Sequence, residues 1–290
     1  MTTDPIVALE SLGYTEREAA FLFLVAVHSG YFLRRQFDYF IDRNRGGTVL
    51  RFLEKARING HIKFLDPKHG RQVYHLFYKS IYRLLGAADS QNRRVKGDAR
   101  VRASLMKLDY VLENDQERYL ETDEEKFRFF TETRGLDSRM ITEGGVSFSS
   151  SIQSALISIA DRTRPATALV RFVFIDEGML TVAKFDRFLE SLAPLLRAVA
   201  YFELVYVATS DHNFRTSAAL FRNQFAGDTG RQQELLNPEW QRSTPRNGPS
   251  SLPLRAQFTT MLLRFSYPSL QRNELRCSAG CSAIDSGAKQ

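Results

Sequence analysis

The chain has 290 residues, of which 43% are hydrophobic and 12% aromatic, enough to form the core of one large domain or two of ordinary size. This composition excludes a globally disordered chain. The formal net charge of +7 favours an anionic partner, such as nucleic acid or a membrane surface.

Two features point away from secretion and membrane insertion. The first four residues, MTTD, begin no basic region followed by an apolar run, so no signal peptide is expected. The apolar runs at 19–27 and 168–175 are far shorter than the roughly 20 residues that span a bilayer. The two cysteines, Cys277 and Cys281, are too few to form a disulfide framework in a chain of this length. No histidine lies near them in the sequence, so no zinc site is expected. We therefore expect a soluble cytoplasmic protein with no membrane partner.

The positive charge is concentrated near the N-terminus. Between Thr15 and Arg83 there are 13 Lys/Arg against 6 Asp/Glu, a surplus that equals that of the whole chain. A short, apolar-rich segment that carries all the net charge is typical of a module with one basic face.

The first helices of this segment have local start signals. Thr15 and Glu18 form a T-x-x-E capping box, which predicts a helix that runs to about His28. A second, short helix is expected from about Leu33, and the polar turn DRNRGG follows it.

The third helix is expected to begin near Thr48 and to end at Gly60, a residue that commonly terminates helices in a left-handed conformation. On a helical wheel its apolar residues face one side, and four polar residues share the other side. These four are Thr48, Arg51, Lys55 and Asn59.

A hairpin is expected directly after this helix. The segments HIKFL (61–65) and VYHLFY (73–78) have strand character, and DPKHGRQ between them contains the proline and glycine typical of a turn. Lys68 and Arg71 lie in this turn.

Three helices and a hairpin in this order resemble the winged helix-turn-helix family of DNA-binding domains, over Thr15 to Leu85. The resemblance implies that the third helix enters the major groove of double-stranded DNA and that the wing contacts the adjoining backbone. Winged helices also serve as protein-docking modules, which is an alternative. By position, the implied DNA-contacting residues are Arg43, Arg45, Thr48, Arg51, Lys55, Asn59, Lys68 and Arg71.

The remainder of the chain predicts a second unit of α/β type. Residues 86–102 are polar and are expected to form a linker, and amphipathic helices are expected at 103–113 and 123–133. Strands at 168–175 and 202–209 alternate with helices at 184–199 and 216–225, which predicts a parallel βαβα arrangement. The expected divisions are a winged helix domain at 1–85, a linker at 86–102, an α/β domain at 103–226 and a disordered tail at 227–290, with at most a short helix at 257–265.

This arrangement loosely resembles replication-relaxation-type proteins of mobile elements, which combine an N-terminal winged helix with a C-terminal α/β part. The likeness lies in LGYTEREAAFLFLVAVHSGYFLRRQF and in the strand, helix and strand of FVFIDEG, FDRFLESL and FELVYVAT. It implies a role in the replication, transfer or regulation of a mobile element. The α/β domain would then mediate homodimerisation or contact with another partner.

A metal-dependent nuclease is the alternative from the enzyme class. Acidic residues follow both predicted strands, Asp176 and Glu177 after the first and Asp211 after the second, where an open sheet gathers functional groups. The acidic-x-Lys element of common nuclease cores is missing from these strands, and helix caps or turns explain Asp176 and Asp211 more simply. We therefore assign no catalytic residue, metal or cofactor, and expect sequence- or structure-directed DNA binding.

Overall fold

The computed structural model describes residues 4–41, 46–65, 72–139, 155–160, 168–199, 201–226, 239–242 and 259–266. The chain is a mixed α/β protein with a three-stranded and a six-stranded sheet in these ranges. None of the helices described there has the length and apolar character required to cross a bilayer.

The N-terminal unit combines short helices with the small sheet, in which β3 is the central strand and pairs antiparallel with both β1 and β2. Its elements are α1 (Pro5–Glu10), α2 (Glu16–His28), β1 (Tyr31–Leu33), α3 (Arg34–Phe40), α4 (Gly46–Ile58), β2 (Ile62–Leu65), β3 (Val73–Leu76) and α5 (Lys79–Leu84).

The second unit is built on the larger sheet, with strand order β4-β5-β6-β7-β9-β8. Within it β6 and β7 are parallel, as the sequence predicts, and every other pair is antiparallel. Its elements are η1 (Gln91–Arg93), α6 (Asp98–Glu113), β4 (Arg118–Tyr119), α7 (Asp123–Arg128), η2 (Phe129–Thr133), β5 (Leu156–Ile159), β6 (Val170–Asp176), α10 (Val182–Ala198), β7 (Tyr201–Ala208), α11 (Phe214–Ala226), β8 (Glu239–Arg242) and β9 (Thr259–Ser266).

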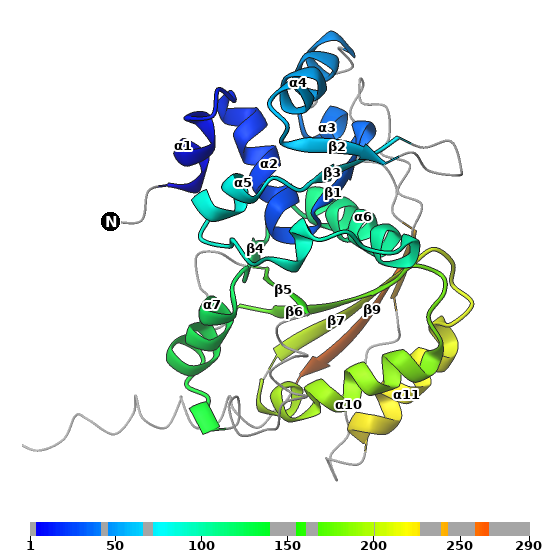
Figure 1. Cartoon of the computed structure of the whole chain (residues 1–290). Coiled ribbons are helices and arrows are strands. Elements are labelled where there is room, and N and C mark those ends of the chain that lie inside the picture. The colour runs from blue at the N-terminus through cyan, green and yellow to red at the C-terminus, as the bar shows by residue number, and fades with distance from the viewer. Residues whose placement is uncertain are drawn as a thin grey trace, which may run out of the picture.

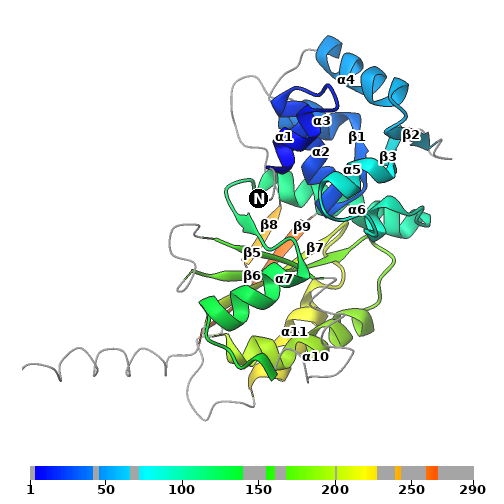
Figure 2. The same ribbon diagram turned by 60° about the vertical axis from the view of Figure 1, so that its left-hand side comes forward.

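The elements are stacked in layers (Figure 1). The N-terminal unit lies at one end, α6 separates it from the larger sheet, and α10 and α11 cover the opposite face of that sheet. Turning the molecule shows α4 again at the end farthest from α10 and α11 (Figure 2). The fold therefore presents α4 at one extremity of the molecule.

Two helix boundaries confirm the signals read from the sequence, whereas α4 begins at Gly46, two residues before the start expected near Thr48. Thr15 and Glu18 make the reciprocal hydrogen bonds of a capping box at the start of α2. At the end of α4, Gly60 has a φ of +68°, its N–H donates to the carbonyl of Arg57, and His61 N–H donates to that of Ala56. These two bonds form a Schellman motif, for which glycine is favoured.

The N-terminal unit also contains a strand that the sequence did not predict. β1 precedes α3 and pairs with β3 along Tyr31 to Leu33, and the predicted second helix accordingly begins at Arg34. A three-residue strand is too short to produce a measurable alternation, and only its pairing with β3 identifies it. The predicted hairpin is confirmed where the structure describes it, with Ile62 opposite Leu76 and Leu65 opposite Val73.

The segment expected to be a linker is structured and packs on the N-terminal unit. Asn92 in η1 donates from Nδ2 to the carbonyls of Ala26 and Val27, at 3.1 and 2.7 Å. Lys96 donates from Nζ to Ser29 O at 3.0 Å, and burial lowers the pKa of this lysine to about 8. These polar residues are therefore hydrogen-bonding partners of buried backbone groups, which composition alone does not distinguish from solvated loop residues.

The C-terminal region requires a correction. The short helix expected at 257–265 is instead the strand β9, which pairs antiparallel with β7 from Tyr201–Ser266 to Ala208–Thr259. The apolar run is too short for periodicity to separate helix from strand. Pairing with β9 satisfies the second edge of β7, which would otherwise leave a row of backbone groups unpaired. The tail expected to be disordered thus contributes β8 and β9 to the sheet.

Gly30 lies where η1 packs closely against the N-terminal unit. It has a φ of +79°, and a Cβ at this position would lie 2.0 Å from the backbone oxygen of Asn92. Gly60 has a similar φ of +68° but open space around it. We expect Gly60→Ala to cost about 1 kcal/mol for the left-handed backbone, and Gly30→Ala to cost about 1–3 kcal/mol more because of the clash. Urea denaturation of the two variants measures the difference, and equal losses would contradict the packing of η1.

Candidate nucleic-acid interface

One face of α4 packs into the N-terminal core. Phe52 is fully buried and stacks on Phe37 of α3 with ring centroids 4.1 Å apart. The apolar residues that share this face are Val49, Phe52, Leu53 and Ala56.

The opposite face of α4 is exposed and mixed in chemistry. At about 100° per residue, Arg51, Glu54 and Ile58 fall within an arc of about 60° directly opposite the buried residues. Leu50 and Arg57 lie on one flank of this arc. All five are exposed, Leu50 at 55% and Ile58 at 72%. We call these five residues the outer face of α4.

The residues that the sequence placed together on one polar face differ in exposure and in their partners in the structure. Arg51 is exposed and belongs to the outer face, where its Nε donates to the carbonyl of Gly47 at 3.2 Å. Thr48 and Lys55 are half-buried, and Asn59 is exposed. The other four predicted residues, Arg43, Arg45, Lys68 and Arg71, lie outside the described residues.

Lys55 has partners within the fold. Its Nζ lies 2.6 Å from Glu18 Oε2 and donates to Gly13 O at 3.1 Å. The ammonium also lies 5.4 Å from the centre of the Tyr14 ring. Since Glu18 also completes the capping box of α2, Lys55 connects α4 to the start of that helix. Its charge is therefore largely neutralised by a residue 37 positions away, which a helical wheel cannot reveal.

Two charged residues of the outer face, Glu54 and Arg57, were not predicted from the sequence, and neither was Lys63 on β2. Lys63 is half-buried and its Nζ lies 5.2 Å from the centre of the Phe77 ring. The exposure pattern of α4 identifies the first two, since they occupy wheel positions between those of the predicted residues and the end of the apolar face.

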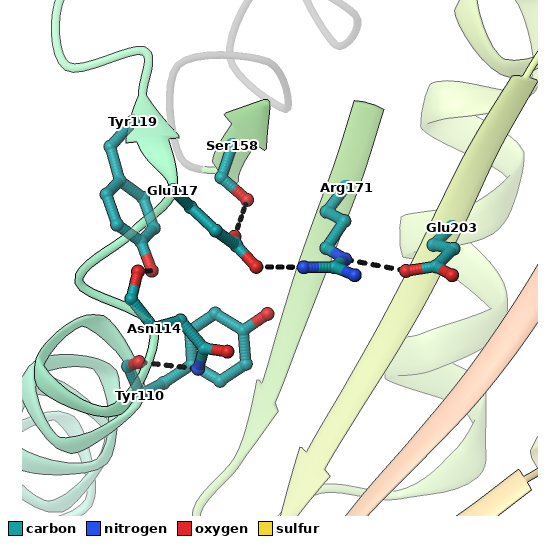
Figure 3. Close-up of polar contacts among 7 residues, drawn as sticks. All are labelled: Tyr110, Asn114, Glu117, Tyr119, Ser158, Arg171 and Glu203. Atoms are coloured by element: carbon teal, nitrogen blue, oxygen red, sulfur yellow. Dashed lines mark hydrogen bonds and ion pairs between the residues drawn. The ribbon is translucent and has the colours of Figure 1, made fainter. Parts of the chain in front are cut away.

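A second polar cluster lies between α6 and the large sheet (Figure 3). Arg171 on β6 bridges two carboxylates, Glu117 and Glu203, which are 6% and 2% exposed. Its Nε lies 2.6 Å from Glu203 Oε2, and its Nη1 contacts Glu117 Oε1. Ser158 on β5 donates to Glu117 Oε2 at 2.5 Å. The network therefore joins three neighbouring strands to the turn that follows α6.

The tyrosines around this network are held neutral. Burial and the nearby Glu117 raise the pKa of Tyr110, and burial together with Tyr110 and Glu117 raises the pKa of Tyr119. Tyr119 donates to Asn114 O at 3.3 Å, and Asn114 donates to Tyr110 O at 2.8 Å. Tyr110, Tyr119 and the two glutamates are buried between α6 and the sheet, which indicates that the network holds α6 on the sheet.

A third cluster connects the N-terminal unit to α7. His28 at the end of α2 is buried, and its Nε2 lies 3.9 Å from Glu121 Oε1. Burial, aided by positive charge on Lys107 and Lys126, lowers the pKa of His28 well below its ordinary value. Lys126 is buried and donates to Ala155 O at 3.0 Å, and burial lowers its pKa to about 8. His28 is therefore neutral at physiological pH.

Asp176, which the nuclease alternative would use, forms a turn. Its Oδ1 accepts hydrogen bonds from the backbone of Gly178 and Leu180, at 2.9 and 3.3 Å. Its Oδ2 accepts from Tyr206 Oη at 2.8 Å and Asn213 Nδ2 at 3.3 Å. The carboxylate thus closes the loop after β6, which agrees with its interpretation as a turn former.

The ion pair of Lys55 gives a prediction about stability. Lys55→Met leaves Glu18, which is about one-tenth exposed, without its cation and should cost on the order of 1 kcal/mol. Arg51→Met is the matched control and should change stability by less than about 0.5 kcal/mol, because Arg51 is exposed. Urea denaturation, with Glu18→Gln added to complete a double-mutant cycle, measures the coupling. Equal effects of the two substitutions would argue against this pairing.

The bridge at Arg171 gives a prediction with a pH dependence. Arg171→Met removes the cation that bridges Glu117 and Glu203 while both carboxylates stay buried, and should cost about 3–5 kcal/mol at pH 8. With the cation gone, both carboxylates stay buried, and protonating them at low pH relieves the cost of burying their negative charge. The deficit should therefore be smaller at pH 5 than at pH 8. Arg187→Met, on the exposed side of α10, is the control, and a deficit independent of pH would refute the bridge.

Comparisons of the chain with protein-family models, with curated proteins and with solved structures found no match. Function is therefore inferred from the geometry and charge of α4 and the β2–β3 hairpin.

Proposed function

We propose that this chain binds double-stranded DNA through the outer face of α4 and the adjoining β2–β3 hairpin. The observation that carries the proposal is the position and exposure of α4. It lies at one extremity of the molecule and buries one face, while the opposite face is exposed and carries two arginines and one glutamate. A helix of 13 residues held in this way has the dimensions to enter a major groove.

The order of the surrounding elements supports this interpretation. α2, β1, α3, α4, β2 and β3 follow one another, and β1-β3-β2 form one sheet, so the hairpin leaves the end of α4 directly. This is the arrangement expected of a winged helix-turn-helix domain. The localised surplus of Lys and Arg supplies the charge that phosphate binding requires.

A protein-docking role is the second candidate, and exposed apolar side chains favour it. Leu50, Ile58 and Phe64 are 55%, 72% and 46% exposed, on α4 and on β2 that follows it. The dependence of affinity on salt concentration distinguishes the two candidate functions. DNA binding weakens steeply with ionic strength because counterions are released, whereas apolar docking does not.

The arginines of the outer face give the central prediction. In the full-length chain, Arg51→Ala with Arg57→Ala should weaken binding to random-sequence duplex about tenfold or more near 150 mM salt. It should also reduce the slope of log affinity against log salt by roughly one for each phosphate that is no longer neutralised. Fluorescence anisotropy at several salt concentrations measures both quantities.

The matched control has the same change in charge at the other end of the molecule. Lys184 and Arg187 are exposed on α10, and replacing both by alanine should leave affinity and salt slope almost unchanged. Equal weakening by the two double variants would mean that net charge alone drives the binding. No salt-dependent binding by the wild-type chain would refute the proposed function.

A further inference from the structure

Glu54 is the anomaly of the proposed DNA-binding face. It lies in the centre of the outer face, one turn after Arg51 and one turn before Ile58, and is exposed. In the described part of the chain no ion pair joins its carboxylate to Arg51 or Arg57. A free carboxylate at this position repels phosphate and lowers affinity for DNA in general.

The same carboxylate has one favourable target in a major groove. Guanine presents two acceptors there and thymine one, so both repel it. Adenine presents an N6 donor beside an N7 acceptor, which faces a second carboxylate oxygen unfavourably. Cytosine presents its N4 donor with no adjacent acceptor, and accepting from this group is the role that the chemistry gives to Glu or Asp.

We propose that Glu54 makes the interface sequence-selective by accepting a hydrogen bond from cytosine N4 and by repelling the other base edges. This inference rests on the proposed function and extends it from DNA binding to the recognition of a particular base. Glu54 lowers non-specific affinity and raises discrimination, so the two effects have one physical origin.

The neighbours of Glu54 are consistent with a helix that reads bases. Along the axis, Arg51 precedes it by about 4.5 Å and Ile58 follows it by about 6 Å, compared with about 3.4 Å between base pairs. The three side chains can therefore reach neighbouring base pairs. Arginine matches the two acceptors of guanine, and the isoleucine side chain can pack on a thymine methyl group.

A change of specificity tests the proposal. Preferred sites are selected from a random duplex pool with the full-length wild-type chain and with Glu54→Gln, Glu54→Ala and Glu190→Gln. The wild type should select cytosine at one position, on the order of tenfold over other bases. Glu54→Gln should select adenine there, because glutamine pairs with both N6 and N7, with the other positions unchanged.

Glu54→Ala should lose the preference at that position and bind random duplex more tightly, because the repulsion is removed. Glu190 is exposed on α10, so Glu190→Gln removes one negative charge elsewhere and should leave both the preferred site and the affinity unaltered. All three variants replace exposed side chains, and thermal unfolding checks that they fold as the wild type does.

The outcomes separate the inference from the function on which it rests. Salt-dependent binding by the wild type with no position that responds to Glu54→Gln would overturn the role of Glu54 and leave DNA binding intact. Absence of binding to any duplex at low salt would overturn both. Binding to a protein partner, with Glu54→Ala altering that affinity alone, would also overturn the role of Glu54 in base recognition.

Discussion

The carboxylate of Asp109 joins α6 to α3 of the N-terminal unit, and the placement of the candidate site depends on this connection. It lies on α6, is 3% exposed, and accepts from both terminal nitrogens of Arg35 at 3.0 and 2.6 Å. It also accepts from Gln36 Nε2 at 2.7 Å, while the Oε1 of Gln36 accepts from Leu33 N–H at the start of α3. The position of α3 is thus determined by α6. Because Phe37 of α3 stacks on Phe52 of α4, the orientation of α4 follows from the same contacts.

α6 can serve both layers because it is buried on two sides. Leu108 and Leu112 belong to the core of the N-terminal unit, whereas Met106, Tyr110 and Val111 pack with residues of the large sheet. The bridge of Arg171 between its two glutamates then holds the end of α6 against that sheet. Buried ion pairs of this kind contribute little net stability, but leaving one partner alone is costly, so they favour one relative placement of the elements. A face presented for binding gains from such rigidity because less ordering entropy is lost on association.

Local chemistry made part of the fold predictable. The capping box at Thr15 and the glycine stop at Gly60 are each encoded within a few residues, and both are confirmed. The parallel pair β6–β7 is also confirmed, because the order of strand, helix and strand along the chain predicts it. The errors involve partners distant in sequence. β1 and β9 exist as strands only through pairing with β3 and β7, and the supposed linker is ordered by backbone groups of α2. The candidate site shows the same difference between local and distant contacts. The helical wheel correctly predicts that Arg51 is exposed, but it cannot predict that Lys55 pairs with a residue on another helix.

Hydrogen–deuterium exchange of the full-length chain, with and without a random-sequence duplex at low salt, tests the proposed DNA-binding face most directly. We expect slowed exchange in α4 and in the β2–β3 hairpin, and no change in α10 or α11, which lie at the opposite end of the molecule. Protection confined to α10 and α11, or no protection anywhere at a duplex concentration that saturates binding, would contradict this assignment.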